Sequence, residues 1–157
     1  MPARVYVETS IVSYLTARPS RDLIVAGHQQ VTHEWWRSQR SRFHLFASQL
    51  VIREASGGDP EAARARLRAL DDLPLLEILP AAVTLSQALL TQGALPRKAT
   101  ADALHIAVAA AHGIEYLLTW NCKHIANAEM RPLIERTCRV HGVEPPVLCT
   151  PEELMGG

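Results

Sequence analysis

Residues 99–121 read ATADALHIAVAAAHGIEYLLTWN and are the most informative stretch of the chain for its fold class. Its first part is rich in alanine, which has the highest helix propensity, and Gly113 stands where helices commonly end. Residues 115–120 then combine aromatic and apolar side chains, which is typical of a strand. We therefore predict a helix over 99–111 that leads directly into a strand.

Strands and helices alternate along the rest of the chain as well. Further strands are predicted at 4–8, 43–47, 75–79 and 147–149. Helices are predicted over 9–17, from Ser20 to about Arg40, from Ser48 through Glu54, from Pro60 to Leu70, from Pro80 to about Gly93, and over about 129–141. Such alternation favours a mostly parallel sheet covered on both faces. With no repeat and no long linker, we expect residues 1–157 to form one α/β domain.

Short polar residues mark where several helices begin. Ser20, Ser48 and Asp59 precede helical segments and have side chains that can cap the first turn. Pro60 follows at the first helical position, where its missing N–H is not needed. Residues 150–153 (TPEE) have the Thr-x-x-Glu spacing of a capping box, which predicts a capped turn near the end of the chain.

The composition is that of a globular protein with balanced charge. Hydrophobic residues make up 48% of the chain and charged residues 20%. Lys+Arg and Asp+Glu both number 16, so any contact with nucleic acid must come from a local basic patch rather than from net charge. The longest apolar runs are too short for a membrane span, and we expect a soluble protein with no membrane partner.

Cysteine usage points to a reducing compartment. Cys122, Cys138 and Cys149 form no CxxC pair and no zinc-ligand spacing. An odd number of cysteines without an N-terminal targeting segment predicts a cytoplasmic protein.

Four acidic or amide residues stand at related places around the predicted strands. They are Glu8 at the end of the first strand, Glu54 in the helix after the second, Asp102 in the first turn of the helix at 99–111, and Asn121 after the strand that follows. Ligands of open parallel sheets bind outside the carboxyl ends of the strands, so we expect these side chains to converge. Clustered carboxylates repel one another, and a divalent cation removes that repulsion. The pattern predicts a Mg²⁺ or Mn²⁺ site.

Each of these residues also has a purely structural interpretation. Asp102 at a helix N-terminus would stabilise the helix dipole without any catalytic role. Glu54 can face solvent beside Arg53, Glu8 can serve as a helix N-cap, and Asn121 can be an ordinary turn residue.

These residues make the chain resemble the PIN-domain family, and within it the VapC-type toxins of bacterial toxin–antitoxin pairs. The family's opening motif, an acid followed by Thr or Ser and a small polar residue, corresponds to residues 8–10 (Glu-Thr-Ser). Its second acid corresponds to Glu54, and its third opens the motif DALHIA at 102–107. Its fourth follows a strand that ends in Leu-Thr and corresponds to Asn121. The resemblance covers about residues 4–150.

The resemblance implies a three-layer α/β/α sandwich with a five-stranded parallel sheet of order 3-2-1-4-5. It implies a nuclease, a hydrolase that cuts RNA phosphodiesters with Mg²⁺ or Mn²⁺. Glu8, Glu54 and Asp102 would hold the metal directly or through water, with the carbonyl of Asn121 as a further ligand. It also implies a homodimer bound by an antitoxin, one of whose basic side chains enters the acidic groove.

Two positions depart from the family pattern. Glu8 stands in place of Asp and adds a methylene, and Asn121 removes one negative charge. Both changes favour one metal ion over two and predict reduced or metal-selective activity. The alternative is a degenerate PIN domain that binds RNA or an antitoxin without cutting.

Several side chains are candidates for contact with the RNA. Thr9 and Ser10 would steady the first carboxylate or contact phosphate, and Arg97 and Lys98 precede Asp102 in a loop that suits phosphate contact. Residues 35–42 (WWRSQRSR) mix aromatic and basic side chains, but fit a core-facing Trp pair beside a solvated helix end equally well.

Two other kinds of site are less well supported by the sequence. Cys122, His105, His112 and His124 lack the spacing of a zinc or thiol-nucleophile site, and a core or helix-surface role for the histidines is favoured. A receiver-like signalling domain would need an Asp after the strand at 75–79 and a Lys after the strand at 147–149, and neither is present.

Overall fold

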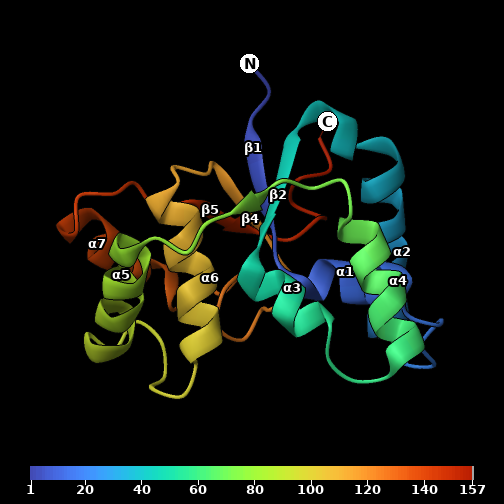
Figure 1. Ribbon diagram of the computed structural model, residues 1–157, viewed down its shortest axis with the longest axis horizontal. Coiled ribbons are helices and arrows are strands. Elements are labelled where there is room, and N and C mark those ends of the chain that lie inside the picture. Colours follow the sequence, from blue (N-terminus) through green and yellow to red (C-terminus); the bar gives the residue numbers. More distant parts are fainter. Residues whose placement is uncertain (157) are drawn as a thin grey trace.

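The strands form one parallel sheet in the order β3-β2-β1-β4-β5 in the computed structural model, which describes residues 1–156 (Figure 1). The five strands are β1 (Arg4–Val7), β2 (His44–Ser48), β3 (Leu75–Leu76), β4 (Tyr116–Leu118) and β5 (Val147–Cys149). Every pair of neighbours runs parallel. The predicted fold class and strand order are therefore confirmed.

Two groups of helices lie to either side of the strands (Figure 1). The first group contains α1 (Thr9–Thr16), α2 (Leu23–Ser38), α3 (Gln49–Ala55) and α4 (Pro60–Leu70). The second contains α5 (Pro80–Thr91), α6 (Thr100–Ala111) and α7 (Arg131–Val140). A short 3-10 turn at Arg40–Arg42 leads from α2 into β2. No helix among residues 1–156 is long and apolar enough to cross a membrane.

The middle of the core is made by β1 and α6. Val5, Tyr6 and Val7 have no exposed surface, and most of α6 is buried too. Alanine side chains allow α6 to approach its neighbours closely, and a helix that is apolar on most of its faces belongs in the interior. This packing fixes the DALHIA motif against the central strand, which positions the candidate site.

Most of the predicted helix starts are confirmed. Ser48 accepts from the backbone of Val51 to cap α3, and Asp59 accepts from Ala62 to cap α4. Ser20 is not the cap of α2. That helix begins later, with Asp22 accepting from two backbone N–H groups of the first turn, because a carboxylate placed directly before the turn reaches both.

The third strand is shorter than predicted. It covers only Leu75–Leu76, although the apolar run extends to Leu79. Leu79 is already the N-cap of α5, and the carbonyl of Glu77 is bonded by the His112 ring at 2.7 Å instead of by a neighbouring strand. The chain therefore leaves its pairing with β2 after Leu76, because it has to reach the start of α5 at Pro80.

The Trp pair divides between the core and the surface. Trp35 is fully buried and its indole N–H donates to the carbonyl of Leu154 at 3.1 Å. Trp36 is half-buried beneath the Arg40 guanidinium, 4.3 Å from the ring centroid. The core interpretation is confirmed for Trp35.

The predicted capping box is also present, because Thr150 and Glu153 exchange backbone-to-side-chain hydrogen bonds.

Candidate metal centre

Glu8 lies at the carboxyl end of the central strand and is almost completely buried. Its carboxylate accepts from the hydroxyls of Ser10 and Thr119, both at 2.5 Å, and from the backbone N–H of Ser10 at 3.1 Å. The last of these bonds makes Glu8 the N-cap of α1. The structural interpretation of Glu8 as a helix N-cap is thus confirmed. Together, the three hydrogen bonds fix its carboxylate at the edge of the sheet.

Glu54 reaches the same edge from α3. Thr9 donates to its Oε1 at 2.5 Å, and His105 Nε2 lies 2.8 Å from the same oxygen. Burial raises the pKa of Glu54, but the hydrogen bonds from His105 and Thr9, with the charges of His105 and Arg53, hold that pKa below its usual range. Glu54 therefore carries a negative charge at neutral pH.

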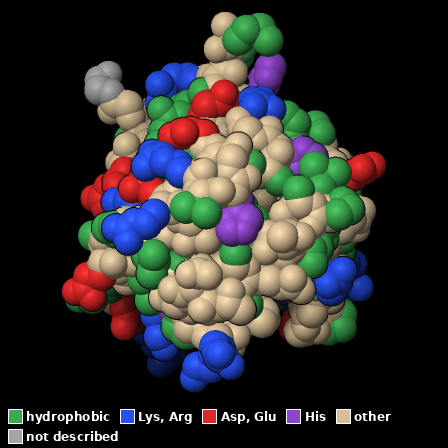
Figure 2. Space-filling view, turned by 90° about the vertical axis from the view of Figure 1, so that its left-hand side faces the viewer, with side chains coloured by type: hydrophobic (Ala, Val, Ile, Leu, Met, Phe, Trp, Pro, Cys, Tyr) green, Lys and Arg blue, Asp and Glu red, His purple; other side chains and the backbone are tan. Residues whose placement is uncertain are grey.

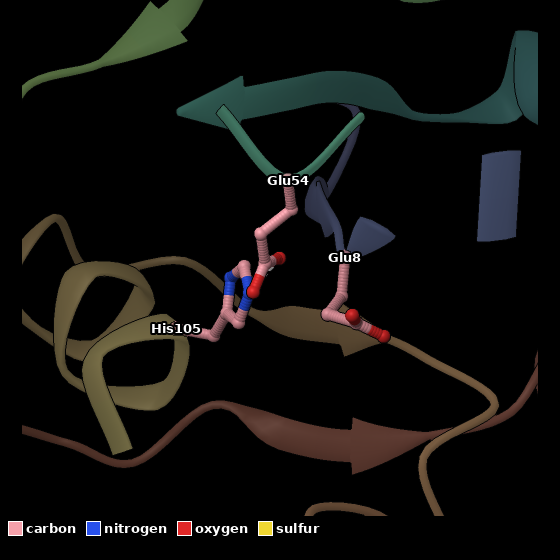
Figure 3. Close-up of side chains that lie close together, drawn as sticks. All are labelled: Glu8, Glu54 and His105. Carbon is pink, nitrogen blue, oxygen red and sulfur yellow. Dashed lines mark hydrogen bonds and ion pairs between the residues drawn. The ribbon is translucent and has the colours of Figure 1, made fainter. Parts of the chain in front are cut away.

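The two carboxylates meet at His105. Ligand atoms of Glu8, Glu54 and His105 all lie within 4.8 Å of one another. Figure 3 shows His105 and Glu54 facing each other, from α6 and α3, with Glu8 beside them at the end of β1. Within residues 1–156 no other group of three or more His, Cys, Asp or Glu side chains is this tightly clustered.

Asp102 and Asn121 form a second group around His124. Asp102 stands in the first turn of α6, and its Oδ2 lies 2.8 Å from His124 Nδ1. The backbone N–H of His124 donates to Asn121 Oδ1 at 3.0 Å. Asp102 is not a member of the cluster formed by Glu8, Glu54 and His105. The structure thus joins two of the four predicted ligands and pairs the other two through His124.

A model of the family described as PIN domain matches residues 5–122, which include all four predicted ligands. The chain belongs to the PIN-domain family. A search of curated protein sequences found no significant match. One solved structure with a similar fold is described as VapBC2 from Rickettsia felis bound to a DNA fragment from their promoter. The TM-score is 0.55 at 18% identity, covering 76% of this chain and 89% of that chain, so this likeness concerns the fold alone.

The donor set of this PIN domain suits a divalent cation. Carboxylate oxygens are the ligands preferred by Mg²⁺ and Mn²⁺, and imidazole nitrogen is also a ligand of transition ions. Among the described residues, Glu54 Oε2 and Asp102 Oδ1 accept no hydrogen bond, while the other oxygen of each carboxylate is held by a partner. Glu54 and Asp102 therefore each keep one oxygen available for a cation, while the other oxygen restrains the orientation of the carboxylate.

The residues predicted to contact RNA lie in two places. Thr9 and Ser10 point at the carboxylates, because their hydroxyls donate to Glu54 and Glu8. Arg97 and Lys98 are exposed in the turn before α6 and form no ion pair within residues 1–156.

Three side chains of the site were not singled out from the sequence as part of it. Thr119 holds Glu8, His124 holds Asp102, and His105 holds Glu54. For His105 a signal existed, because it follows Asp102 by three residues and so lies on the same face of the helix. We favoured a core or helix-surface histidine from the sequence, and the exposed fraction of His105, 1%, agrees with a core position. Its hydrogen bond to Glu54 was not predicted.

Proposed function

We propose that this PIN domain is a metal-dependent endoribonuclease of the VapC toxin type, with RNA as its substrate. The observation that carries the proposal is the meeting of Glu8 and Glu54 at the carboxyl edge of the central strands, in a chain that belongs to the PIN-domain family. Among residues 1–156 this is the one cluster with the donor chemistry for a divalent cation.

Glu8, Glu54 and Asp102 would hold Mg²⁺ or Mn²⁺, with the Asn121 carbonyl as a further ligand. A bound cation lowers the pKa of a water and stabilises negative charge that develops on the phosphate. Ser10 and Thr119 keep the Glu8 carboxylate in place, and Thr9 does the same for Glu54. The Asn121 carbonyl already accepts the His124 backbone, which supports one cation rather than two.

The RNA chain would cross the sheet edge where these acids lie. Arg97 and Lys98 are exposed in the turn that precedes Asp102, and they would contact its phosphates. A basic patch near the site is required because the net charge is zero. Figure 2, which views the molecule from the side of α5 and α7, shows acidic and basic side chains interspersed, so that face offers no broad cationic surface.

We also propose a homodimer and an antitoxin partner. The fold is similar to a chain of a complex described as VapBC2, and the acidic cluster of this chain would accept a basic side chain from such a partner. Light scattering of the purified protein tests the dimer. Co-expression with a protein encoded beside this chain tests the partner, and a stable complex that blocks RNA cleavage is expected.

RNA cleavage by the purified protein tests the proposed activity. Single-stranded RNA would be incubated with Mg²⁺, Mn²⁺ or EDTA, with Glu54→Gln and Asp102→Asn as site variants. Glu152→Gln is the matched control, because Glu152 is exposed and outside the cluster. Metal-dependent cutting that both site variants lose and the control keeps is expected. No cutting by folded protein with either metal would contradict the proposal.

A second candidate is a PIN domain that binds RNA or an antitoxin without cutting. Three observations favour it: both carboxylate oxygens of Glu8 already accept hydrogen bonds, Asp102 is paired with His124, and the fourth ligand position is an amide. RNA binding that is unaffected by EDTA, together with no product at any metal concentration, would identify this function instead.

A further inference from the structure

A buried polar network lies directly beneath the two carboxylates. The Tyr6 hydroxyl lies 2.7 Å from His105 Nδ1 and 2.8 Å from the Ser48 hydroxyl. His105 continues the network to Glu54 through Nε2 at 2.8 Å. Tyr6 and Ser48 have no exposed surface and His105 has 1%, so the bonds that Tyr6 makes to Ser48 and His105 are shielded from water.

The network attaches α3 to the central strand at two points. Ser48 caps the N-terminus of α3 by accepting from Val51, and its hydroxyl also meets Tyr6. Glu54, in the last turn of the same helix, meets His105, which also meets Tyr6. One hydroxyl group on β1 therefore fixes both the start of α3 and the carboxylate near its end.

The proton positions in this network follow from the chemistry of its members. An ionised Glu54 only accepts hydrogen bonds, so His105 Nε2 carries a proton. The Tyr6 hydroxyl can donate one hydrogen bond and accept another, which matches its two partners, His105 Nδ1 and the Ser48 hydroxyl.

We propose that Tyr6 and His105 are positioning residues that set the separation of the Glu8 and Glu54 carboxylates for a divalent cation. Tyr6 and Glu8 are two residues apart on one extended segment, so the hydroxyl and the first carboxylate share a common frame. Glu54 lies on α3, and its hydrogen bond with His105 fixes the position of its carboxylate relative to Tyr6 and Glu8. This inference rests on the proposed function, because it assigns the network to the cation site of that function.

Titration with Mn²⁺, followed by the electron paramagnetic resonance signal of the free ion, tests the inference. The variants are Tyr6→Phe, which removes only the hydroxyl, His105→Leu, and His105→Gln. Tyr116→Phe is the matched control, because Tyr116 lies on the neighbouring strand β4 and its hydroxyl has no hydrogen-bond partner among residues 1–156. Circular dichroism checks that every variant is folded.

Loss of groups that orient metal ligands typically weakens metal binding tenfold to a hundredfold. We expect Tyr6→Phe and His105→Leu to weaken Mn²⁺ binding by about tenfold or more. His105→Gln should recover part of the loss, because its amide can donate to Glu54 and accept from Tyr6. Tyr116→Phe should bind as the unaltered protein does. A purely structural role would not produce recovery by glutamine.

If the unaltered protein binds Mn²⁺, either of two results would overturn the inference. Unchanged Mn²⁺ affinity in folded Tyr6→Phe would show that the hydroxyl does not position the site. A ¹⁴N coupling to bound Mn²⁺ in pulsed spectra, lost in His105→Gln, would make His105 a direct ligand instead. If the unaltered protein binds no Mn²⁺, the proposed function fails, and the role of Tyr6 is then tested by a metal-free crystal structure of Tyr6→Phe. A displaced Glu54 carboxylate in that structure would support the positioning role. A carboxylate in its original place would contradict it.

Discussion

His124 Nδ1 lies 2.8 Å from Asp102 Oδ2, so the third predicted ligand is paired with a histidine rather than with the other acids. Both side chains are partly shielded, with exposed fractions of 16% and 22%. His124 holds Asp102 outside the cluster of Glu8, Glu54 and His105, so Asp102 has to move in order to share a cation with them. The site combines a fixed part, at Glu8 and Glu54, with a part that has to rearrange.

His124→Ala should strengthen Mn²⁺ binding. A hydrogen bond contributes about 0.5–1.5 kcal/mol, so release of Asp102 from His124 should tighten binding by up to about tenfold. Calorimetric titration measures the change. His33→Ala is a suitable control because, within residues 1–156, the His33 ring on α2 forms one hydrogen bond, to the Leu15 carbonyl on α1. Weaker binding in His124→Ala would instead mean that His124 orients Asp102 for the metal.

Thr119→Val should destabilise the fold and loosen Glu8. The Thr119 hydroxyl is completely buried and donates to the Glu8 carboxylate at 2.5 Å. Hydrogen bonds to charged groups contribute about 1.5–3 kcal/mol, and we expect a loss of about that size in urea unfolding. Thr84→Val on the exposed face of α5 is the control and should change stability by less than about 0.5 kcal/mol. Equal unfolding midpoints for the two variants would contradict the assigned role of Thr119.

The contribution of Glu54 to stability should depend on pH. Its pKa is held below the usual value of 4.5, so its ionised form is favoured by folding. The stabilisation is therefore fully present above the unfolded-state pKa and is lost as the pH falls through the lower folded-state pKa. Urea unfolding of the unaltered protein and Glu54→Gln should differ at pH 7, and the difference should shrink as the pH falls below 4.5. A difference that persists unchanged at pH 3 would contradict this account.

The three thiols should differ in reactivity. Cys122 is exposed, whereas Cys138 and Cys149 are buried. Burial raises the pKa of Cys138 to about 11 and that of Cys149 to about 12, so neither forms much thiolate at neutral pH. We expect Ellman's reagent at pH 8 to label Cys122 alone in the native protein, and all three thiols in guanidinium. Rapid labelling of Cys138 or Cys149 before unfolding would contradict the packing around β5 and α7.

The sequence was sufficient to predict the sheet and the convergence of Glu8 with Glu54. Both follow from general rules: alternating strands and helices pair in parallel, and the carboxyl ends of such strands share an edge. The length of the third strand could not be predicted from the sequence. Four of the five residues from Leu75 to Leu79 are apolar, and the pairing is limited by the start of α5 at Pro80.

The partners of the acids were harder to predict than the acids themselves. Tyr6 stands in an apolar strand and reads as a core aromatic, and nothing local indicates that its hydroxyl meets a helix 99 residues away. The contact between His124 and Asp102 depends on the conformation of an irregular segment after Asn121, where no periodic pattern constrains the backbone. Such contacts are decided by tertiary packing.

Anomalous diffraction from crystals soaked in Mn²⁺ locates the cation without assuming an activity, and so tests whether Glu8 and Glu54 form a metal site. We expect one strong peak in coordination contact with Glu8 and Glu54, with Asp102 turned from His124 towards the ion. A peak elsewhere on the molecule, or an empty cluster with Asp102 still bonded to His124 at saturating Mn²⁺, would contradict it.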